Sequence, residues 1–375
     1  MTRPVYVRAV GVSGFGRFPE RALPELCWDA LDDCLGADPG RDVEAVYLGN
    51  VYGPNGLGPR VVHGAGLSGR PVLAVEAACA SGSVAFAQAV RDVRSGRHET
   101  VLAVGCEQLT TAFRGPITPQ AGDPEGRSGM ALPAVYAMAA RRYLDHYGVT
   151  PDQLAAVAAK NLTNAVRNPR SPRSEPVTVD DVLASRMIAD PLTRMQCCSL
   201  TDGAAAALVT ATPGPGLLVR SSVFRSGGPW GAGSPHVWGY DLVRLTGQAA
   251  YEQAGVGIAD ADLVEVHDAF SIGEIISIEA LGLADEGLGG ALAVSGDSAP
   301  GGKSPVNVSG GLIGLGHPLG ATGLSQLAEA FYQLTGTAGD RQLDDPRLAV
   351  VETMGGGTAG VDGNACVVSV LEAAR

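Results

Sequence analysis

The 375-residue sequence has few aromatic residues and little positive charge. Phe, Trp and Tyr make up 5% of it, and 27 Lys and Arg against 39 Asp and Glu give a net charge of −12. So acidic a chain lacks a general electrostatic attraction for nucleic acid, and this argues against a nucleic-acid-binding protein. A local basic patch for an anionic ligand remains compatible with this composition.

The sequence also lacks the patterns of a metalloprotein, a secreted protein and a membrane protein. Its seven cysteines include no CxxC pair, and no group of Cys and His has zinc spacing, so we expect no metal. The odd cysteine count and the absence of a secretory signal predict a cytoplasmic protein. No apolar run approaches the ~20 residues of a membrane-spanning helix, so we expect no membrane span.

Glycine and short apolar runs are abundant instead. The chain has 52 Gly and is 45% apolar. Apolar runs of strand length, such as residues 45–51 and 348–354, alternate with amphipathic runs of helical length, such as residues 83–96 and 323–336. Strands that alternate with helices predict an α/β fold.

An internal repeat divides the chain. ASGSVAFAQAVRDVRSG, starting at Ala80, corresponds to ATGLSQLAEAFYQLTG, starting at Ala321, and each lies between two apolar strands. We therefore expect two similar halves, 1–213 and 214–375, separated at the linker TATPGPGL. The stretch at about 110–190 has no counterpart and is interpreted as an insertion in the first half. A seam between two α/β halves is a favourable place for a site.

Two residues at equivalent strand-to-helix turns of the repeat could carry chemistry. Cys79 lies where a strand leads into a helix, and a helix N-terminus stabilises a thiolate and lowers its pKa. A free cysteine is also commonly just buried packing, so both interpretations stand at this point. A nucleophilic cysteine needs a base. His317, in a glycine-dense loop at the equivalent turn, would face Cys79 if a two-fold axis relates the halves.

Further polar groups accompany this pair. His267 lies at the end of the strand EVHDAF, where its neighbour Asp268 either orients it or points away. The glycine run that starts at Gly355 frees backbone N–H groups for an oxyanion hole. A basic segment would either attract a phosphorylated ligand or be a solvated loop; it contains Lys160, Arg167, Arg170 and Arg173. Cys197, Cys198 and Cys366 are expected in the core.

Four motifs together resemble the thiolases. These are CASG at Cys79, HDAF at His267, GHPLGATG at His317 and the GGG at Gly355, and the similarity extends over nearly the whole chain. The sterol-carrier-protein-type and archaeal thiolases are the most similar subgroup. The resemblance implies a five-layer α-β-α-β-α fold with a loop domain inserted in the first half. It also implies a homodimer or tetramer, coenzyme A thioesters as substrates and no tightly bound cofactor.

The resemblance also assigns a role to each motif residue. Cys79 would take the acyl group as a thioester, and His317 would activate its thiol. His317 would then help to hold the thioester oxygen of the second substrate, and His267 belongs to the same oxyanion hole, at the position where many thiolases have an asparagine that orients a water. The backbone amides of Cys79 and Gly355 would surround the carbonyl of the acyl-enzyme. The basic residues between 160 and 173 would contact coenzyme A.

One departure from the family pattern concerns the second reactive cysteine. Many thiolases have it in a CxGGG pattern, where this chain has Thr353, and some place it in the HDxF loop, where this chain has Ala269. A threonine hydroxyl cannot replace a thiol as a base, so His267 and His317 remain as candidate bases.

Three functions are therefore considered. The first is an acyl-CoA acyltransferase that performs Claisen condensation or its thiolytic reverse. The second is a retro-aldolase or C-acyltransferase of the same fold that works with a small OB-fold, zinc-ribbon partner. The third is a non-catalytic assembly subunit, against which the intact motifs argue.

Overall fold

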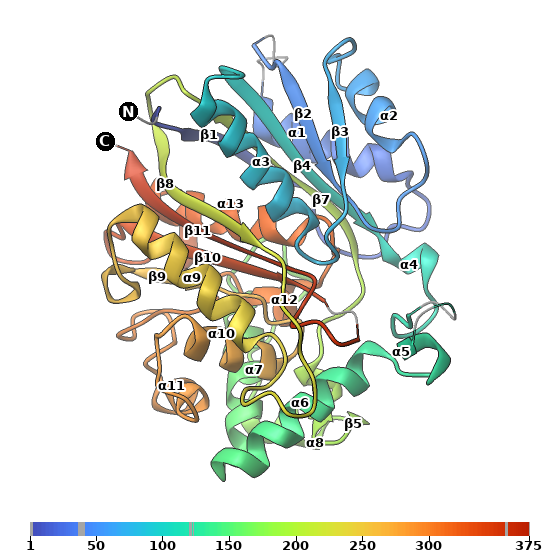
Figure 1. Cartoon of the computed structure of the whole chain (residues 1–375), viewed down its shortest axis with the longest axis vertical. Coiled ribbons are helices and arrows are strands. Elements are labelled where there is room, and N and C mark those ends of the chain that lie inside the picture. Colours follow the sequence, from blue (N-terminus) through green and yellow to red (C-terminus); the bar gives the residue numbers. More distant parts are fainter. Residues whose placement is uncertain (1–2, 37–41, 120–121, 123, 357–358, 375) are drawn as a thin grey trace.

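Strands from both halves of the chain meet in one mixed sheet. The computed structural model describes residues 3–36, 42–119, 122, 124–356 and 359–374, and among these the strand order is β3-β2-β4-β7-β1-β8-β11-β10-β9 (Figure 1). The first half contributes β3 (Val72–Val75), β2 (Ala45–Gly49), β4 (Thr100–Gln108), β7 (Asp202–Thr210) and β1 (Tyr6–Val12). The second half contributes β8 (Gly216–Arg225), β11 (Ala365–Ala374), β10 (Leu348–Gly355) and β9 (Leu263–Glu265).

The two halves repeat the same strand arrangement about the contact between β1 and β8. There Tyr6 pairs with Leu218 and Val7 with Leu217. Outward from this contact, β7, β4, β2 and β3 correspond to β11, β10, β9 and the segment at Val306, which pairs with Val264 in β9. The predicted repeat is therefore present in the fold.

Helices complete five layers. α3 (Ser81–Ser95) and α13 (Thr322–Leu334) contact each other and strands of both halves, so they form the central layer. α1 (Leu23–Leu35) and α2 (Leu57–Gly64) cover the first half-sheet, and α9 (Tyr240–Ala254) with α10 (Ser271–Ala280) covers the second (Figure 1). The predicted α-β-α-β-α fold is confirmed.

Small residues let the central layer pack closely. α3 is rich in Ala, Ser and Gly, and most of its residues are buried. A Cβ on Gly82 would lie 2.3 Å from the carbonyl oxygen of Gly320, which precedes α13. Any larger residue would force these segments apart, so glycine at this position brings the starts of α3 and α13 together.

The segment between β4 and β7 forms the predicted insertion (green in Figure 1). Its elements are α4 (Leu109–Ala112), α5 (Pro124–Arg127), α6 (Leu132–Tyr147), α7 (Pro151–Ala165), α8 (Val179–Ala184), β5 (Met187–Ala189), β6 (Leu192–Thr193) and η1 (Arg194–Gln196). Tyr136 of α6 stacks on Phe270 at 4.3 Å between ring centroids, which fixes the insertion against the second half. The division at residue 213 falls between β7 and β8 and stays a prediction.

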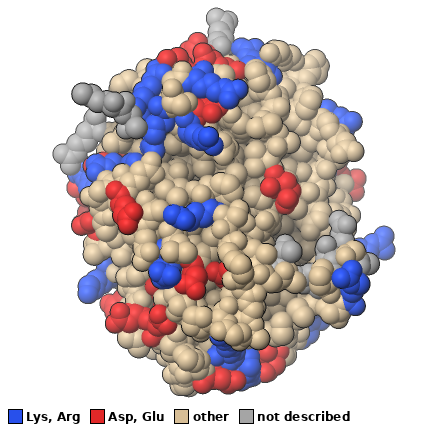
Figure 2. Space-filling model, viewed as in Figure 1, with Lys and Arg blue, Asp and Glu red and all other residues tan. Residues whose placement is uncertain are grey.

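The second half has further short helices. They are η2 (Ile258–Asp260), α11 (Gly289–Ser295), α12 (Gly311–Leu315) and η3 (Gly339–Arg341). α7 of the insertion packs against α10, α11 and α12. Within the described chain, no helix is long and apolar enough to cross a membrane. Figure 2 shows charges of both signs interspersed on one face, with Lys and Arg gathered over α3.

Candidate active site

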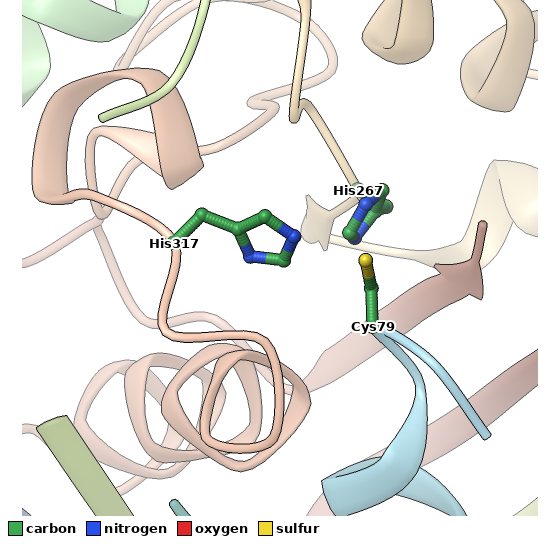
Figure 3. Close-up of side chains that lie close together, drawn as sticks. All are labelled: Cys79, His267 and His317. Carbon is green, nitrogen blue, oxygen red and sulfur yellow. The ribbon is translucent and has the colours of Figure 1, made fainter. Parts of the chain in front are cut away.

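Three side chains from three loops converge between the halves (Figure 3). Cys79 precedes α3, His267 follows β9, and His317 lies between α12 and α13. The sulfur of Cys79 and one nitrogen from each imidazole all lie within 4.8 Å of one another. The two rings meet edge to face, with 5.0 Å between centroids and 73° between planes. The structure thus brings together the nucleophile and both histidines predicted from the repeat and the motifs.

A tightly bonded turn holds Cys79. Ala78 has a φ of 49°, a left-handed conformation that is costly for a residue with a Cβ. The Ser81 hydroxyl compensates by accepting from the Ala77 N–H at 2.9 Å and donating to the Ala78 carbonyl at 2.6 Å. The strained turn therefore has a fixed geometry.

The hydrogen bonds of His317 determine its tautomer. Its Nδ1 lies 2.7 Å from Thr322 Oγ1, and that hydroxyl donates to the Pro318 carbonyl at 3.2 Å. Because the single hydroxyl proton is used there, Nδ1 must carry the proton that it donates to Thr322. Nε2 therefore has a free lone pair, and among the described residues this buried atom has no hydrogen-bond partner. His317 is set up to accept a proton.

His267 is held through its backbone. Its N–H donates to Glu352 Oε2 at 3.0 Å, whereas neither ring nitrogen finds a partner within the part of the chain that is described. Burial lowers the pKa of His267 to about 3. Burial and then the nearby His267 lower the pKa of His317 well below its ordinary value. Both imidazoles are therefore neutral at pH 7.

Asp268 does not orient His267. Its carboxylate accepts from Asn161 Nδ2 at 2.7 Å and from the Leu312 N–H at 2.6 Å, at the start of α12. Burial raises the pKa of this carboxyl to about 8. Of the two alternatives considered for Asp268, the structure supports the one in which it points away and ties the insertion to the second half.

The protonation state of Cys79 differs from the sequence-based expectation. Burial, with smaller contributions from Glu107 and Glu76, raises the pKa of its thiol to about 12, although the amides of Gly356 and of Cys79 itself act to lower it. The expected lowering by the helix start was wrong, because desolvation outweighs it. The resting site is a neutral thiol beside neutral imidazoles, so attack by sulfur requires transfer of its proton.

The glycine run reaches Cys79 through Gly356, and the predicted role of the Gly355 amide in an oxyanion hole stays a prediction. Gly356, rather than Gly355, lines the cavity and directs its amide at the Cys79 sulfur. Gly355 lies in β10, where a Cβ would be 2.4 Å from the Ala77 carbonyl oxygen. Its glycine is required for that close approach.

A cavity of about 790 Å³ leads to Cys79 and His317. Its walls include Phe113, Ile117 and Tyr136 from the insertion. Four arginines also line it, and the sequence analysis missed all of them: Arg17, Arg114, Arg186 and Arg194. They are scattered along the chain, so no local cluster of charge marked them.

The predicted basic segment does not line this cavity. Lys160 is buried in an ion pair with Glu274, at 3.1 Å, and Arg170 stacks over Tyr332. Arg167 is exposed, and Arg173 lines a separate cavity of about 430 Å³. The segment is therefore not one continuous surface, because the fold sends its members in different directions, and its contact with coenzyme A stays a prediction.

The two positions without the family's second thiol have other surroundings. Thr353 is fully buried and links Ser83, at 2.9 Å, to Gln326, at 2.7 Å. The carbonyl of Ala269 accepts from the N–H of Cys198, at 2.9 Å. Cys198 lines the cavity, which corrects its assignment to the core.

Two family models match the chain, one in each half. The model "Thiolase, N-terminal domain" matches residues 13–212, and "Thiolase C-terminal domain-like" matches residues 235–367.

Curated proteins are similar along nearly the full chain. The acetyl-CoA acetyltransferase of Methanothermobacter thermautotrophicus is 38% identical, over 96% of this chain and 98% of that protein. The sterol carrier protein 2 of Rattus norvegicus is 34% identical, over 95% of this chain and 71% of that protein. The benzoylsuccinyl-CoA thiolase subunit BbsB of Thauera aromatica is 35% identical, over 95% and 96%.

Two solved structures share the fold. The Ltp2-ChsH2(DUF35) aldolase superposes with a TM-score of 0.85 at 24% identity, covering 100% of this chain and 99% of that chain. Human mitochondrial 3-ketoacyl-CoA thiolase superposes with a TM-score of 0.74 at 18% identity, covering 99% of each chain. At these identities the likeness concerns the fold alone.

Proposed function

The chain belongs to the thiolase family and is a thiolase-type acyltransferase, and we propose that it transfers acyl groups from coenzyme A thioesters through a thioester at Cys79. The observation that carries this proposal is the convergence of one sulfur and two imidazole nitrogens within 4.8 Å beside a cavity. A thiol, a base with a free lone pair and room for a long substrate are what acyl transfer to cysteine needs.

Acylation begins with proton transfer. His317 Nε2 accepts the Cys79 proton as the sulfur attacks the acyl carbonyl, so the high thiol pKa is overcome only in the transition state. The amides of Cys79 and Gly356 stabilise the oxyanion. The bond to the coenzyme A sulfur then breaks, and His317 returns the proton to that leaving thiolate.

The second half-reaction uses the same histidines. His267, whose neutral ring carries one N–H, holds the thioester oxygen of the second substrate by donating to it. His317, again neutral, removes the α-proton, because Thr353 is bonded within the core and Ala269 has no titratable group. The carbanion attacks the acyl carbonyl, the bond to the Cys79 sulfur breaks, and His317 returns the abstracted proton to that thiolate, which completes a Claisen condensation. Thiolytic cleavage is the reverse.

Four arginines would anchor the substrate. Coenzyme A carries phosphates, and guanidinium groups bind phosphate by charge-assisted, often paired hydrogen bonds. Arg17, Arg114, Arg186 and Arg194 line the cavity that leads to Cys79. We assign coenzyme A binding to this set in place of the segment at 160–173.

Mass spectrometry of the intact protein tests the proposal. After incubation with acetyl-CoA and longer acyl-CoAs, we expect one added acyl group on the peptide that contains Cys79. Cys79→Ala should lose the adduct, and Cys198→Ala, which removes another cysteine of the same cavity, should retain it. Condensation or thiolysis without any Cys79 adduct would refute the covalent route.

A retro-aldolase is the second candidate, and the surroundings of Thr353 and Ala269 favour it. Neither position offers a thiol to move an α-proton, and retro-aldol cleavage needs only removal of a β-hydroxyl proton. Such an activity would involve the small OB-fold, zinc-ribbon partner.

The two candidates differ in their need for free coenzyme A, which thiolysis consumes and retro-aldol cleavage does not. Failure of both reactions, with and without co-expressed partner, would favour an assembly subunit.

A cytoplasmic homodimer is part of the proposal. β3 is an edge strand that pairs with β2 among the described strands, and its Leu73 is 56% exposed. An apolar sheet edge can be extended by a second copy. Sedimentation analysis should show a dimer that Leu73→Lys weakens.

A further inference from the structure

Cys79, His267 and His317 have the composition of a metal site. They offer one sulfur and two imidazole nitrogens, and their side chains are 7%, 1% and 4% exposed. A thiolate and two imidazoles with a fourth position open is a donor set that Zn²⁺ uses. Bond lengths of about 2.0–2.3 Å place tetrahedral ligands about 3.3–3.6 Å apart. Ligand atoms within 4.8 Å of one another are therefore about 1 Å from closing around the ion.

Unpartnered nitrogens point to a missing ligand. Both ring nitrogens of His267 and Nε2 of His317 are buried without a hydrogen-bond partner among the described residues. A buried polar atom without a partner is costly, and such atoms in a native structure call for an explanation. A substrate oxygen accepts from the single N–H among them during turnover, whereas a metal ion would take one lone pair from each ring at once.

The surroundings complete the requirements of a metal site. Thr322 Oγ1 accepts from His317 Nδ1 at 2.7 Å, which leaves Nε2 free to ligate and supplies the outer partner that ligating histidines usually have. Glu352 fixes the backbone of His267 at 3.0 Å. Glu107 and Glu76 add negative charge near the sulfur, and this field opposes a thiolate but favours a divalent cation.

We propose that Cys79, His267 and His317 bind one Zn²⁺ ion per chain and that this ion reversibly blocks acyl transfer. On binding, the S–H bond of Cys79 breaks, its proton goes to solvent, and the sulfur electron pair forms the bond to zinc. The two imidazoles donate their lone pairs, and water from the cavity takes the fourth position. No electron is transferred, and zinc stays divalent.

Zinc and the acyl group use the same sulfur, so they exclude each other. The site depends on the geometry of three side chains and does not depend on which reaction they catalyse. It can therefore be measured by binding in the absence of substrate, and its failure would leave the acyl transfer proposal intact.

Cobalt substitution provides the first test. The reduced, chelator-treated full chain is titrated with Co²⁺ and then with Zn²⁺. We expect one equivalent of Co²⁺ to produce a sulfur-to-metal charge-transfer band and the strong visible bands of tetrahedral cobalt, and Zn²⁺ to remove both. Competition should give a Zn²⁺ dissociation constant of about 1 μM or tighter.

Variants locate the ion. Cys79→Ser should abolish the charge-transfer band, and His267→Asn and His317→Asn should each weaken Zn²⁺ binding by at least tenfold. Cys198→Ser and His146→Asn are the matched controls, because they remove the same residue types outside the cluster, and they should bind as the wild type does. Circular dichroism verifies that each variant folds. Absence of binding, or binding that survives loss of Cys79 or either histidine, would overturn the proposal.

Protection from alkylation is the second test. Iodoacetamide labels thiols, and peptide mapping reports each cysteine separately. Zn²⁺ should slow the labelling of Cys79 at least tenfold and leave that of Cys198 unchanged, and a chelator should restore the original rate. Equal protection of both cysteines would indicate a general effect of zinc on the protein and would contradict a site at Cys79.

Discussion

Thr322 should control how fast Cys79 becomes acylated, although it is not itself among the residues that line the cavity. Its hydroxyl is the acceptor that keeps the proton of His317 on Nδ1 and the lone pair on Nε2. Thr322→Val removes the hydroxyl and keeps the shape. The Pro318 carbonyl still accepts from the backbone N–H groups of Ala321 and residue 322, so no other buried group loses its partner.

The magnitude follows from the change in charge during the reaction. A hydrogen bond from neutral imidazole contributes about 1 kcal/mol, and one from a charged donor about 1.5–3 kcal/mol. His317 becomes charged as it takes the Cys79 proton, so loss of the acceptor raises the barrier by the difference, about 0.5–2 kcal/mol. Each 1.36 kcal/mol is a factor of ten in rate, so we expect acylation about 2- to 30-fold slower.

Rapid-quench single-turnover experiments with mass detection of the acyl-enzyme measure this rate. Thr322→Ser, which keeps the hydroxyl, should stay within about twofold of wild type, and thermal unfolding midpoints establish that both variants are folded. The reasoning fails if the valine variant acylates at the wild-type rate. It also fails if the serine variant is as slow as the valine variant, since the lost methyl packing would then explain both.

Three further changes test other parts of the account. Thr353→Val removes the hydrogen bonds to Ser83 and Gln326, so the free energy of unfolding in urea should fall by about 1–3 kcal/mol, while the rate of acylation should stay unchanged. A variant that acylates more slowly but unfolds like the wild type would contradict a structural role for Thr353. Burial raises the pKa of Glu107 from 4.5 to about 7, so the folded state holds this proton more tightly than the unfolded chain. That contribution to stability, about 3 kcal/mol, is present below pH 4.5 and is lost as the pH rises to 7. Urea unfolding between pH 5 and 8 measures the free energy of unfolding against pH, and Glu107→Gln should remove this part of its slope. An unchanged slope in the variant would refute the assignment. Replacing both Arg114 and Arg186 by Gln should raise the KM for acyl-CoA about tenfold, whereas Arg170→Gln should not, and equal effects would reject the proposed phosphate site.

The agreement between sequence and structure is greatest where local pattern and repetition carry the information. The alternation of apolar runs determines strands and helices, and the repeat of the segment after Ala80 in the segment after Ala321 determines two matching halves. Once two halves are known, equivalent turns must meet near their symmetry axis, which is why Cys79 and His317 could be paired before any coordinates were known.

The sequence was least informative about which basic side chains lie together in space, because these come from segments that are distant along the chain. The basic residues between 160 and 173 are neighbours in the chain, but Lys160 turns into the core and Arg173 toward another cavity. The arginines that line the cavity of Cys79 come from three separate segments, because Arg186 and Arg194 lie on the same hairpin of β5 and β6. Proximity along the chain therefore did not indicate where each of these side chains lies in the fold.

The tertiary structure decided the protonation state of the Cys79 thiol and which side chains lie close enough to share a ligand. A helix start lowers a thiol pKa when seen alone, but the packing around Cys79 removes water and raises it. Likewise, no spacing of Cys and His suggests a metal, because residues 79, 267 and 317 belong to three loops. Local sequence specifies which groups are available, whereas solvation and the distance between groups depend on everything folded around them.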